Sequence, residues 1–522
     1  MAFAIASGLK PEAGIFTAIV AGFLISALGG SSVQIGGPAG AFIVIVYGIV
    51  ERYGVANLML ATMFAGVLLF AMGLFRFGNL VRLIPVTIVI GFTNGIAVLI
   101  ALSQVKEFFG LQIASMPADF FHKIGAIFQS ANSIHIPTLT ISLVSLAIII
   151  FWPKTYAASN SSIHRILSRL PGTVVVLIVS TALVAIFGLN VETIGTRFGS
   201  IPQTLPNLAL PEFSWGHVRY LFAPALTIAL LGAIESLLCA RVADSMTNER
   251  HDPNQELMAQ GVANLVAPLF GGFCATGTIA RTVTNIRAGA QTPIAGIVHA
   301  ITILLIVLVA APLAQHIPLA ALAAILMFVA YNMGEWSEFR RLKRFSNHYR
   351  AILLTTFILT VAIDLTVAVE VGLILACLFF IGRVSSLTRI EPIGERETAL
   401  QGIDVNQAEI FRLTGSLFFG TVSKMEGLLD PTREPKKWTV LDISNLLNID
   451  ATGLEAIKNL HALLIKRGCK LIICGIPEQP MSIISRSGLA ETIGTDNIVT
   501  DLAHAGRRIA DKKDISNRSV KL

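Results

Sequence analysis

Gly36-Gly-Pro-Ala-Gly40 interrupts one long apolar stretch of this chain, and Gly271-Gly-Phe-Cys-Ala-Thr-Gly277 interrupts another. Each break precedes a helical segment too short to cross a bilayer, which needs roughly 20 apolar residues. These segments cover residues 38–50 and 277–288, and they lie seven positions apart in a series of fourteen apolar segments. Paired interrupted segments in matching halves indicate a transporter built from inverted repeats, with its binding site at the two breaks.

The composition supports a membrane protein with many crossings. Of the 522 residues, 54% are hydrophobic and 14% are charged, whereas soluble domains carry about 25% charged residues. Several stretches without Asp, Glu, Lys or Arg are long enough for two crossings. They are Ala13–Val50, Tyr53–Phe75, Leu83–Val105, Ile124–Pro153, Leu170–Val191, Leu257–Ala280 and Ala288–Gly334. We therefore expect a polytopic α-helical membrane domain over residues 1–384.

The turn and charge signals divide this domain into fourteen expected helices. They cover roughly residues 1–9, 12–30, 38–50, 55–75, 82–104, 136–152, 171–188, 220–243, 254–271, 277–288, 291–312, 317–333, 351–367 and 369–384. The first is interpreted as the second half of a helix whose first half is missing, which either an upstream start or a truncated chain would explain. With a cytoplasmic N-terminus, thirteen Lys and Arg residues fall in inside loops and six in outside loops. This asymmetry predicts a cytoplasmic C-terminal tail and explains the basic net charge without a nucleic-acid partner.

The tail has the pattern of a small soluble α/β domain. Residues 385–404 are expected to be a linker, and residues 405–515 have ordinary charge with alternating strand and helix patterns. Trp438–Ser444 and Lys470–Ile476 are expected to be buried strands, with a helix between them that carries apolar residues at helical spacing. We find no phosphate-binding glycine loop, no metal-ligand cluster and no nucleophile–base set in the sequence, so an enzyme is the least favoured class.

Three motifs resemble the SulP sulfate-permease family of anion transporters. Pro11-Glu-Ala-Gly-Ile-Phe-Thr-Ala18 running on to Gly29-Gly-Ser-Ser32 resembles the family signature, and Gly277-Thr-Ile-Ala-Arg-Thr-Val-Thr-Asn285 resembles its tenth helix. Val440–Ser444 with Ile449–Leu454 resembles the core of the STAS domain that closes most SulP chains. The resemblance implies seven-plus-seven inverted repeats, a core domain that moves against a gate domain, and a homodimer.

The residues around the two breaks form the candidate anion site. Two half-helices that start near Pro38 and Thr278 would aim their N-termini at one point, and each offers unpaired N–H groups and about half a positive charge. Glycines let the backbone approach the ligand, and the two threonines are either hydroxyl donors or helix caps. The candidate substrate-binding residues are Gly37, Pro38, Ala39, Gly40, Thr276, Gly277, Thr278, Ile279 and Arg281.

Two charged residues within apolar segments are candidates for function. Arg281 matches the basic residue that stands beside the anion site in the SulP resemblance, although a snorkelling structural arginine is the alternative. Glu235 is the candidate coupling-ion residue, because intramembrane acids are typical of proton and cation sites. In sodium-coupled bicarbonate members an Asp and a Thr occupy what we take to be the positions of Glu235 and Cys239. Loss of the hydroxyl favours protons over sodium here, and structural pairing with Arg281 stays an alternative.

We therefore expect a secondary transporter of small anions, namely sulfate or a related oxyanion or carboxylate, that works by alternating access with coupled H⁺. The alternatives are a sodium-coupled or exchange-type bicarbonate or chloride transporter, and a membrane-anchored STAS signalling protein. A nucleobase transporter is a less favoured alternative, because nucleobase transporters share the fold but not the STAS tail or the Arg281 motif. In the tail, Thr452 resembles the position of a phosphorylated serine in STAS proteins, but capping of a helix by Asp450 or Thr452 is the plainer interpretation. No cofactor and no bound metal are expected.

Overall fold

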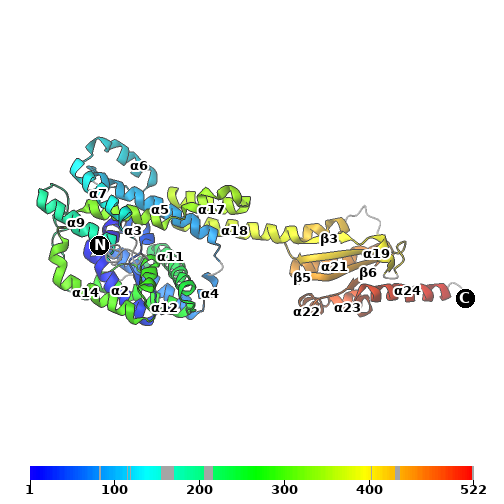
Figure 1. Cartoon of the computed structure of the whole chain (residues 1–522). Coiled ribbons are helices and arrows are strands. Elements are labelled where there is room, and N and C mark those ends of the chain that lie inside the picture. Colours follow the sequence, from blue (N-terminus) through cyan, green and yellow to red (C-terminus); the bar gives the residue numbers. More distant parts are fainter. Residues whose placement is uncertain are drawn as a thin grey trace. The chain divides into compact units, whose positions relative to one another are not determined.

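The computed structural model describes residues 1–81, 84–113, 116–117, 119–153, 170–204, 208, 215–400, 403–429 and 436–519. The chain divides into two compact units, Met1–Ile374 and Leu375–Leu522. The first unit is a helical assembly and the second is built around a β-sheet (Figure 1).

The first half of the membrane unit contains the first break. Its elements are α1 (Ala2–Ala6), α2 (Pro11–Leu28), β1 (Gly36–Gly37), η1 (Gly40–Phe42), α3 (Ile43–Leu74), α4 (Gly78–Val81), α5 (Val86–Phe109), α6 (Phe120–Gln129), η2 (Ala131–Ser133), α7 (Ile136–Phe151), α9 (Gly172–Phe187) and α10 (Ile194–Phe198). Strand β1 and the short helix η1 stand where the sequence places the Gly36–Gly40 break.

The second half repeats this order around the second break. Its elements are α11 (Trp215–Thr247), α12 (Pro253–Val266), η3 (Ala267–Phe270), β2 (Thr276–Gly277), α13 (Ile279–Arg287), α14 (Ile294–Ala314), α15 (Leu319–Met333), α16 (Trp336–Arg340), η4 (Leu342–Arg344), α17 (Asn347–Ala362) and α18 (Leu365–Leu387). Each expected helix has a counterpart in the two halves. Among the described residues, six helices are long and apolar enough to cross a membrane, and three shorter helices are also apolar.

Two details differ from the sequence-based expectation. The segments expected at 38–50 and 55–75 are continuous in α3, because only Gly54 leaves the helical conformation, with φ 81° and ψ 169°. Glycine adopts such positive φ values without steric cost, so the chain kinks there without a separate loop. Helix α6 was not expected, since a helix of ten residues is too short to be recognised as a span.

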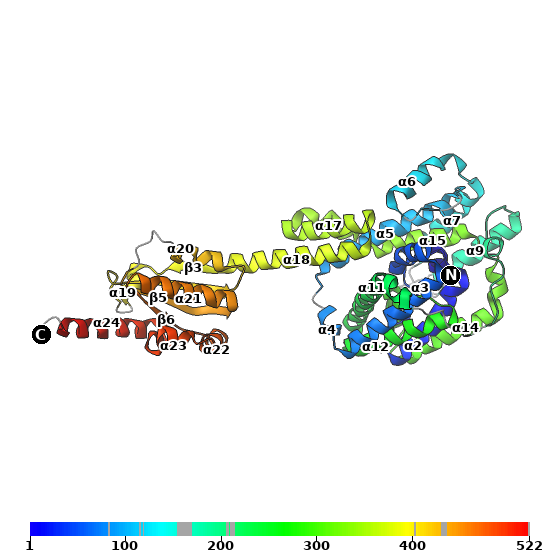
Figure 2. The same cartoon turned by 180° about the vertical axis from the view of Figure 1, so that it is seen from behind.

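The helices of the membrane unit pack as two groups. In one group α3 packs against α11 and α12, and α2 packs against α12 and α14. In the other group α5 packs against α15 and α17, and α7 packs against α9 and α15. Both views show α2, α12 and α14 on one side of this unit and α5, α7 and α17 on the other (Figures 1 and 2). We call these the α2 group and the α5 group.

The second unit is a five-stranded sheet covered by helices on both faces. Its elements are β3 (Arg389–Pro392), α19 (Glu395–Leu400), β4 (Ala408–Leu417), η5 (Val422–Met425), α20 (Glu426–Leu429), β5 (Trp438–Ile449), α21 (Ala451–Lys466), β6 (Lys470–Cys474), α22 (Glu478–Arg486), α23 (Leu489–Ile493), η6 (Thr495–Asn497), β7 (Ile498–Val499) and α24 (Leu502–Ser519). The strand order is β3-β4-β5-β6-β7, antiparallel between β3 and β4 and parallel elsewhere. One apolar core lies under α21, α22 and α23, and a second lies under α24.

Candidate functional site

The two breaks meet as a short antiparallel pair of strands. Gly36 of β1 lies opposite Gly277 of β2, and Gly37 lies opposite Thr276. The pairing brings together the starts of the two half-helices, which are more than two hundred residues apart in the chain. Sequence analysis predicted that the half-helices would converge, but not that the backbone would pair.

Glycine is required in both strands because neighbouring side chains lie too close to leave room for a Cβ atom. A Cβ atom on Gly36 would lie 2.3 Å from Cδ1 of Ile25, and one on Gly277 would lie 1.7 Å from Nε2 of Gln34. Gly37 has φ +147°, and a Cβ there would lie 2.6 Å from Nη1 of Arg281. Neighbouring side chains therefore fill the space beside the strands, and only glycine allows this packing.

Hydrogen bonds from the second break extend the strand pair. The backbone N–H of Thr278 and its hydroxyl each donate to the carbonyl of Ile35 at 2.9 Å. In return, the N–H of Ile35 donates to Oγ1 of Thr282 at 3.0 Å. The residues before β1 are thus fixed to the first turn of α13.

Within the described residues, the starts of both half-helices lack a side-chain cap, η1 at Ala39 and α13 at Thr278. Uncapped helix starts keep their first backbone N–H groups available, and these groups favour negative charge. Pro38 and Ala39 are buried, Gly40 is partly exposed, and Ile279 is 40% exposed.

The two threonines turn their hydroxyl groups toward protein carbonyls. Oγ1 of Thr276 donates to the carbonyl of Gly232 on α11 at 3.0 Å, and Thr278 donates to Ile35. Neither hydroxyl caps α13, so the capping alternative considered for them does not hold. In this conformation their hydroxyl groups link the second break to α11 and to the residue before β1.

Arg281 connects the two breaks. It extends from α13, and its Nη2 donates to the carbonyl of Pro38 at 2.5 Å. No carboxylate among the described residues forms an ion pair with it. The guanidinium therefore brings a positive charge to the starts of both half-helices. Of its five N–H donors, only one on Nη2 makes a hydrogen bond within the described residues.

Glu235 lies on α11 with a partly buried side chain. Within the described part of the chain its carboxylate has no hydrogen-bond or ion-pair partner, so the expected alternative of structural pairing with Arg281 is not observed. One turn further along α11, Sγ of Cys239 donates to Oγ1 of Thr282 at 3.2 Å. The position expected to carry a sodium-ligand hydroxyl in related proteins is thus occupied by a thiol directed at α13.

A second acid, Glu256 on α12, was missed by the sequence analysis. It is fully buried and accepts hydrogen bonds from Ser236 at 2.9 Å, Gln260 at 2.8 Å and the N–H of Gly30 at 3.0 Å. Ser236 in turn accepts from Nε2 of Gln34 at 3.0 Å. This network supports the chain before β1, and the only sequence signal for it was an acid early in an otherwise apolar segment.

Thr17 and Asn264 form hydrogen bonds with the backbone of the second break. The N–H of Phe273 donates to Oγ1 of Thr17 at 2.8 Å. The side chain of Asn264 accepts from the N–H of Ala275 at 2.8 Å and donates to its carbonyl at 2.9 Å. These bonds satisfy the backbone of an irregular segment, which must be paired internally inside a membrane.

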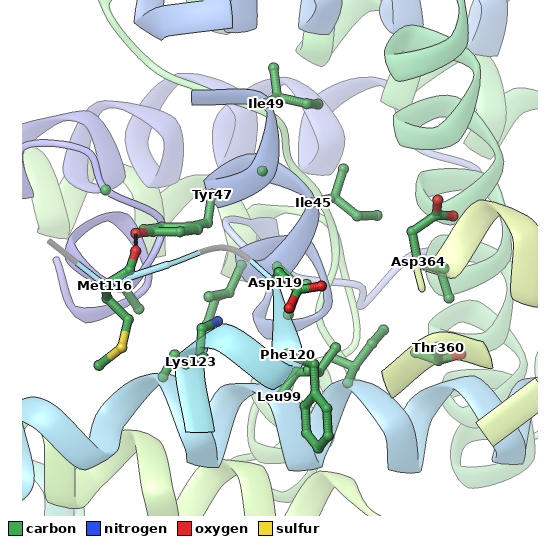
Figure 3. A pocket seen from close by; sticks show the side chains of 18 of the residues that line it. Ile45, Tyr47, Ile49, Leu99, Met116, Asp119, Phe120, Lys123, Thr360 and Asp364 are labelled. Atoms are coloured by element: carbon green, nitrogen blue, oxygen red, sulfur yellow. Dashed lines mark hydrogen bonds between the residues drawn. The ribbon is translucent and has the colours of Figure 1, made fainter. Parts of the chain in front are cut away.

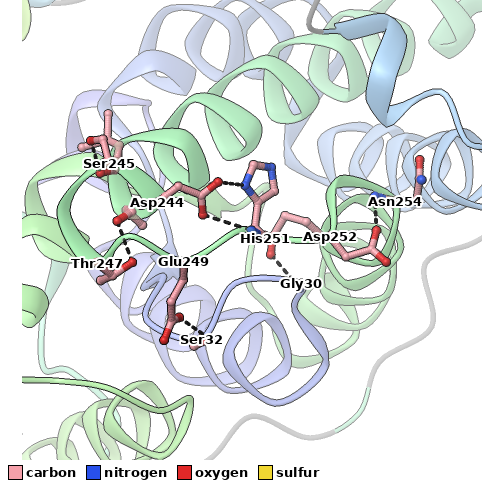
Figure 4. Close-up of polar contacts among 12 residues, drawn as sticks. Gly30, Ser32, Asp244, Ser245, Thr247, Glu249, His251, Asp252 and Asn254 are labelled. Atoms are coloured by element: carbon pink, nitrogen blue, oxygen red, sulfur yellow. Dashed lines mark hydrogen bonds and ion pairs between the residues drawn. The ribbon is translucent and has the colours of Figure 1, made fainter.

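The loop between α11 and α12 secures the chain that leads into the first break (Figure 4). The N–H of Asp252 donates to the carbonyl of Gly30 at 3.1 Å, and the hydroxyl of Ser32 donates to Glu249 at 3.0 Å. The loop itself is closed by His251, whose Nδ1 lies 2.7 Å from Oδ2 of Asp244. Both breaks are therefore anchored to α11 and α12.

In the tail, the start of α21 is capped by Asp450. Its Oδ1 accepts from the N–H of Gly453 at 2.8 Å, and its Oδ2 accepts from the N–H of Phe419 at 3.1 Å. Thr452 is exposed and does not cap the helix. Of the two capping residues considered, Asp450 has this role.

Comparison with known proteins assigns the chain to a family. The sulfate permease family model matches residues 1–356, and the STAS domain model matches residues 402–505. The chain belongs to the sulfate permease family. The putative sulfate transporter YvdB of Bacillus subtilis is 40% identical over 496 residues, which cover 95% of this chain and 91% of YvdB. The family consists of transporters, so the chain is not an enzyme.

Solved structures agree with this assignment. The transmembrane domain of a cyanobacterial bicarbonate transporter, BicA, has a TM-score of 0.63 and 31% identity, and covers 70% of this chain and 92% of its own. The murine anion transporter Slc26a9 in its inward-facing state has a TM-score of 0.84 and 17% identity, and covers 98% and 88%. The predicted fold is confirmed: a polytopic helical membrane protein of seven-plus-seven inverted repeats followed by a STAS domain.

Proposed function

We propose that this protein is a secondary transporter of small anions, and that sulfate or a related oxyanion or carboxylate is its substrate. The observation that carries the proposal is the β1–β2 pair, which sets two uncapped helix starts and the guanidinium of Arg281 side by side. Backbone N–H groups and a guanidinium are the donors that proteins use for oxyanions. The proposed ligands are the residues from Gly37 to Gly40, the residues from Thr276 to Ile279, and Arg281.

The two helix groups supply an arrangement for alternating access. The β1–β2 pair is anchored to α11, α12 and α2, all of which belong to or pack with the α2 group. In our proposal the α2 group carries the anion as a rigid body and slides against the α5 group. Rigid-body movement of one bundle against another is the general route by which repeat-built transporters expose a fixed site to each side.

Coupling to protons is proposed to run through Glu235. Its carboxylate lacks a partner within the described residues, and it lies on the helix that accepts the Thr276 hydrogen bond. Protonation would remove negative charge close to the anion and so favour its binding, and the effect is reciprocal. Sodium coupling is the competing proposal, and the thiol of Cys239 counts against it because hard cations prefer oxygen ligands.

Bicarbonate is a second candidate substrate. The transmembrane domain of BicA, a bicarbonate transporter, is 31% identical to this chain. A site built from backbone N–H groups and one guanidinium selects ligands by negative charge more than by shape. We therefore expect it to accept several small anions. Exchange of bicarbonate or chloride would use the same residues.

The remaining features of the proposal concern domains and location. We propose a membrane domain over residues 1–384, a STAS domain over residues 405–515 on the cytoplasmic side of the cell membrane, and a homodimer. The asymmetry of basic residues between loops supports this orientation. The segment 385–404, expected to be a linker, contains β3, which pairs with β4 of the sheet, and α19. Phosphorylation of the exposed Thr452 is proposed as a means of regulation.

Counterflow in proteoliposomes tests the proposed function. Purified full-length protein is reconstituted with an excess of one unlabelled anion inside, and uptake of labelled sulfate, bicarbonate, chloride and a carboxylate is followed in separate samples. We expect transient accumulation of at least one oxyanion or carboxylate above empty liposomes. Accumulation of none of these anions would overturn the proposal, and transport of chloride and bicarbonate alone would replace sulfate by the second candidate.

A further inference from the structure

A cavity of about 810 Å³ lies apart from the β1–β2 pair. It is bounded by α3, by the second half of α5, by the end of α17 and by the start of α18, with α6 contributing Phe120 and Lys123 (Figure 3). Residues of α1, α10 and α11 also line it. Ala41 and Ile43, which follow directly on the first break, are among its lining residues. The cavity therefore reaches the residues next to the proposed anion site.

Basic and acidic residues line this cavity in equal number, but their partners differ. The acids are Glu107, Asp119, Asp364 and Glu370, and the basic residues are Arg52, Lys106, Lys123 and Arg197. Glu107 is paired with Arg197 at 2.6 Å. Asp119 caps α6 through the N–H of His122 at 3.0 Å and also contacts the His122 ring at 2.8 Å. Asp364 accepts from the N–H of Val367 at 2.9 Å.

Lys123 is the buried cation of the cavity. It is 5% exposed, and its ammonium lies 5.6 Å from the centre of the Tyr47 ring. Within the described residues it donates no hydrogen bond and forms no ion pair. In Figure 3 its nitrogen lies on the cavity side, between Tyr47 and Asp119. A nearly buried ammonium with three donors and no acceptor is costly unless a ligand supplies one.

Tyr47 and two acidic residues form the surroundings of the Lys123 ammonium. Tyr47, which comes from α3, donates through its hydroxyl to the carbonyl of Met116, ahead of α6. The ring face below the ammonium provides only a weak cation–π attraction, worth about 0.5–2 kcal/mol in general. Burial lowers the pKa of Lys123, and the charges of Glu51 and Asp119 oppose that effect. A bound anion would stabilise the charged form further.

We propose that the cavity beside Lys123 is a second anion-binding site, in which a small inorganic oxyanion or halide pauses on its way to or from the β1–β2 pair. The role of this second site rests on the proposed transport function, whereas its ability to bind an anion does not. Lys123 supplies the charge, and among the described residues Glu107, Asp119 and Asp364 bond to other partners and not to Lys123. The residues between it and the first break, Ala41 and Ile43, complete the path.

Protection of Lys123 from acylation tests binding directly. Purified full-length protein is treated briefly with acetic anhydride in sodium sulfate, sodium bicarbonate, sodium chloride or sodium gluconate of equal ionic strength, and acetylation is read by peptide mass spectrometry. We expect at least one small anion to slow acetylation of Lys123 by about threefold or more relative to bulky gluconate. Exposed Lys10, which lies outside the cavity, is the control and should react equally in all four salts. Equal rates at Lys123 in all four would overturn the proposal.

The same measurement on Arg281→Ala separates the two sites. If Lys123 holds its own anion, protection persists when the proposed primary site is disabled. Loss of protection in that variant would show that Lys123 only reports occupancy elsewhere, and the second site would be withdrawn. Protection in a protein that transports no anion would reject the proposed function and leave the second site standing.

Transport kinetics give the functional arm. For entry from the side of the cavity, Lys123→Gln should raise the KM for the transported anion by about threefold to tenfold and leave the maximal rate nearly unchanged. Arg52→Gln, which removes an exposed cation of the same cavity, should change KM less than twofold at physiological salt, because exposed charges are screened. Equal effects of both variants would indicate general electrostatic attraction and would overturn a bound intermediate.

Discussion

The two breaks of the membrane unit share a backbone and differ in chemistry. Both place a two-residue strand before an uncapped helix start, and the strands pair with each other. The first break, Gly36 to Gly40, has no polar side chain at all. The second has Thr276, Thr278 and Arg281, all of which contact the protein around them. One repeat therefore offers only backbone, and the other adds a cation and the hydrogen bonds that hold both together.

This difference separates the parts of the site that set its shape from the part that sets its charge. Shape depends on glycine, since Gly36 and Gly277 are packed against Ile25 and Gln34. Charge depends on one guanidinium, which reaches from the second break to a carbonyl of the first. Substitutions in the two breaks should accordingly affect different measurements.

The largest effect is expected from Gly36→Ala. Its new methyl group would lie within 2.8 Å of Cβ of Ile25 as well as 2.3 Å from Cδ1, so α2 or β1 must shift. Overpacking of this kind costs about 1–3 kcal/mol of stability. Thermal unfolding of the purified protein should start at a lower temperature, and anion transport should be lost.

Gly40→Ala is the matched control within the same break. A Cβ there meets nothing closer than Cδ1 of Ile100 at 3.7 Å, which is ordinary contact. Its unfolding temperature should stay near that of the wild type. If both alanine variants unfold alike, the strand pair is not what fixes the shape of the site.

The next largest effect is expected from Arg281→Ala, which leaves the glycine packing in place and removes the charge together with its hydrogen bond to Pro38. Anion affinity should fall about tenfold to a hundredfold, or roughly 1.4–2.7 kcal/mol. Arg281→Lys should lose less, because it retains the charge but not the planar group that reaches Pro38. Arg287→Ala, an exposed arginine at the far end of α13, is the control. Binding is measured by calorimetry in detergent, and equal affinities for the alanine variants at 281 and 287 would assign Arg281 a structural role.

The site could be predicted from the sequence where chemistry is carried by local pattern. Glycine-rich interruptions and an arginine in an apolar context are visible in the chain itself, so both breaks and Arg281 were recognised. The pairing of Gly36 with Gly277 was not, because short extended segments have no periodicity. Glu256 was missed for a related reason: its partners Gly30, Ser236 and Gln260 converge only after folding.

Hydroxyl direction was equally beyond sequence reasoning. The pattern around Thr276 and Thr278 is compatible with capping, with ligand binding and with the observed bonds to Gly232 and Ile35. Only packing of α11 and of the first break against β2 decides among them. Helix α6 illustrates the same limit, since ten amphipathic residues between spans give little signal until a cavity forms beside them.

A smaller effect is expected from Glu235→Gln, which tests whether coupling belongs to α11 and not to either break. The variant should bind and exchange anions but lose its response to an imposed proton gradient. For one coupled proton, a step of one pH unit supplies about 1.4 kcal/mol, so it can raise the equilibrium accumulation of the anion by at most about tenfold. Uptake is measured in proteoliposomes with and without the pH step at fixed sodium.

Glu370→Gln removes an exposed acid of α18 and serves as the control, with the wild-type response retained. A wild type that ignores the pH step but responds to sodium would make Glu235 a sodium ligand. A wild type that ignores both would leave the protein an exchanger or uniporter.

The smallest effect is expected from Thr278→Val, and it sharpens the contrast between the breaks. The hydroxyl of Thr278 donates to Ile35 at 2.9 Å, while the backbone N–H of the same residue makes a second bond to that carbonyl. Valine keeps the shape and the backbone bond, so stability should fall by about 0.5–1.5 kcal/mol and anion affinity should change less than about twofold. Thr276→Val removes the hydroxyl that donates to Gly232 and should behave in the same way.

Calorimetric titration of both variants with the transported anion checks this expectation. A loss of more than about fivefold in either would mean that the hydroxyl turns to the anion on binding, and the second break would then supply side-chain ligands as well as charge.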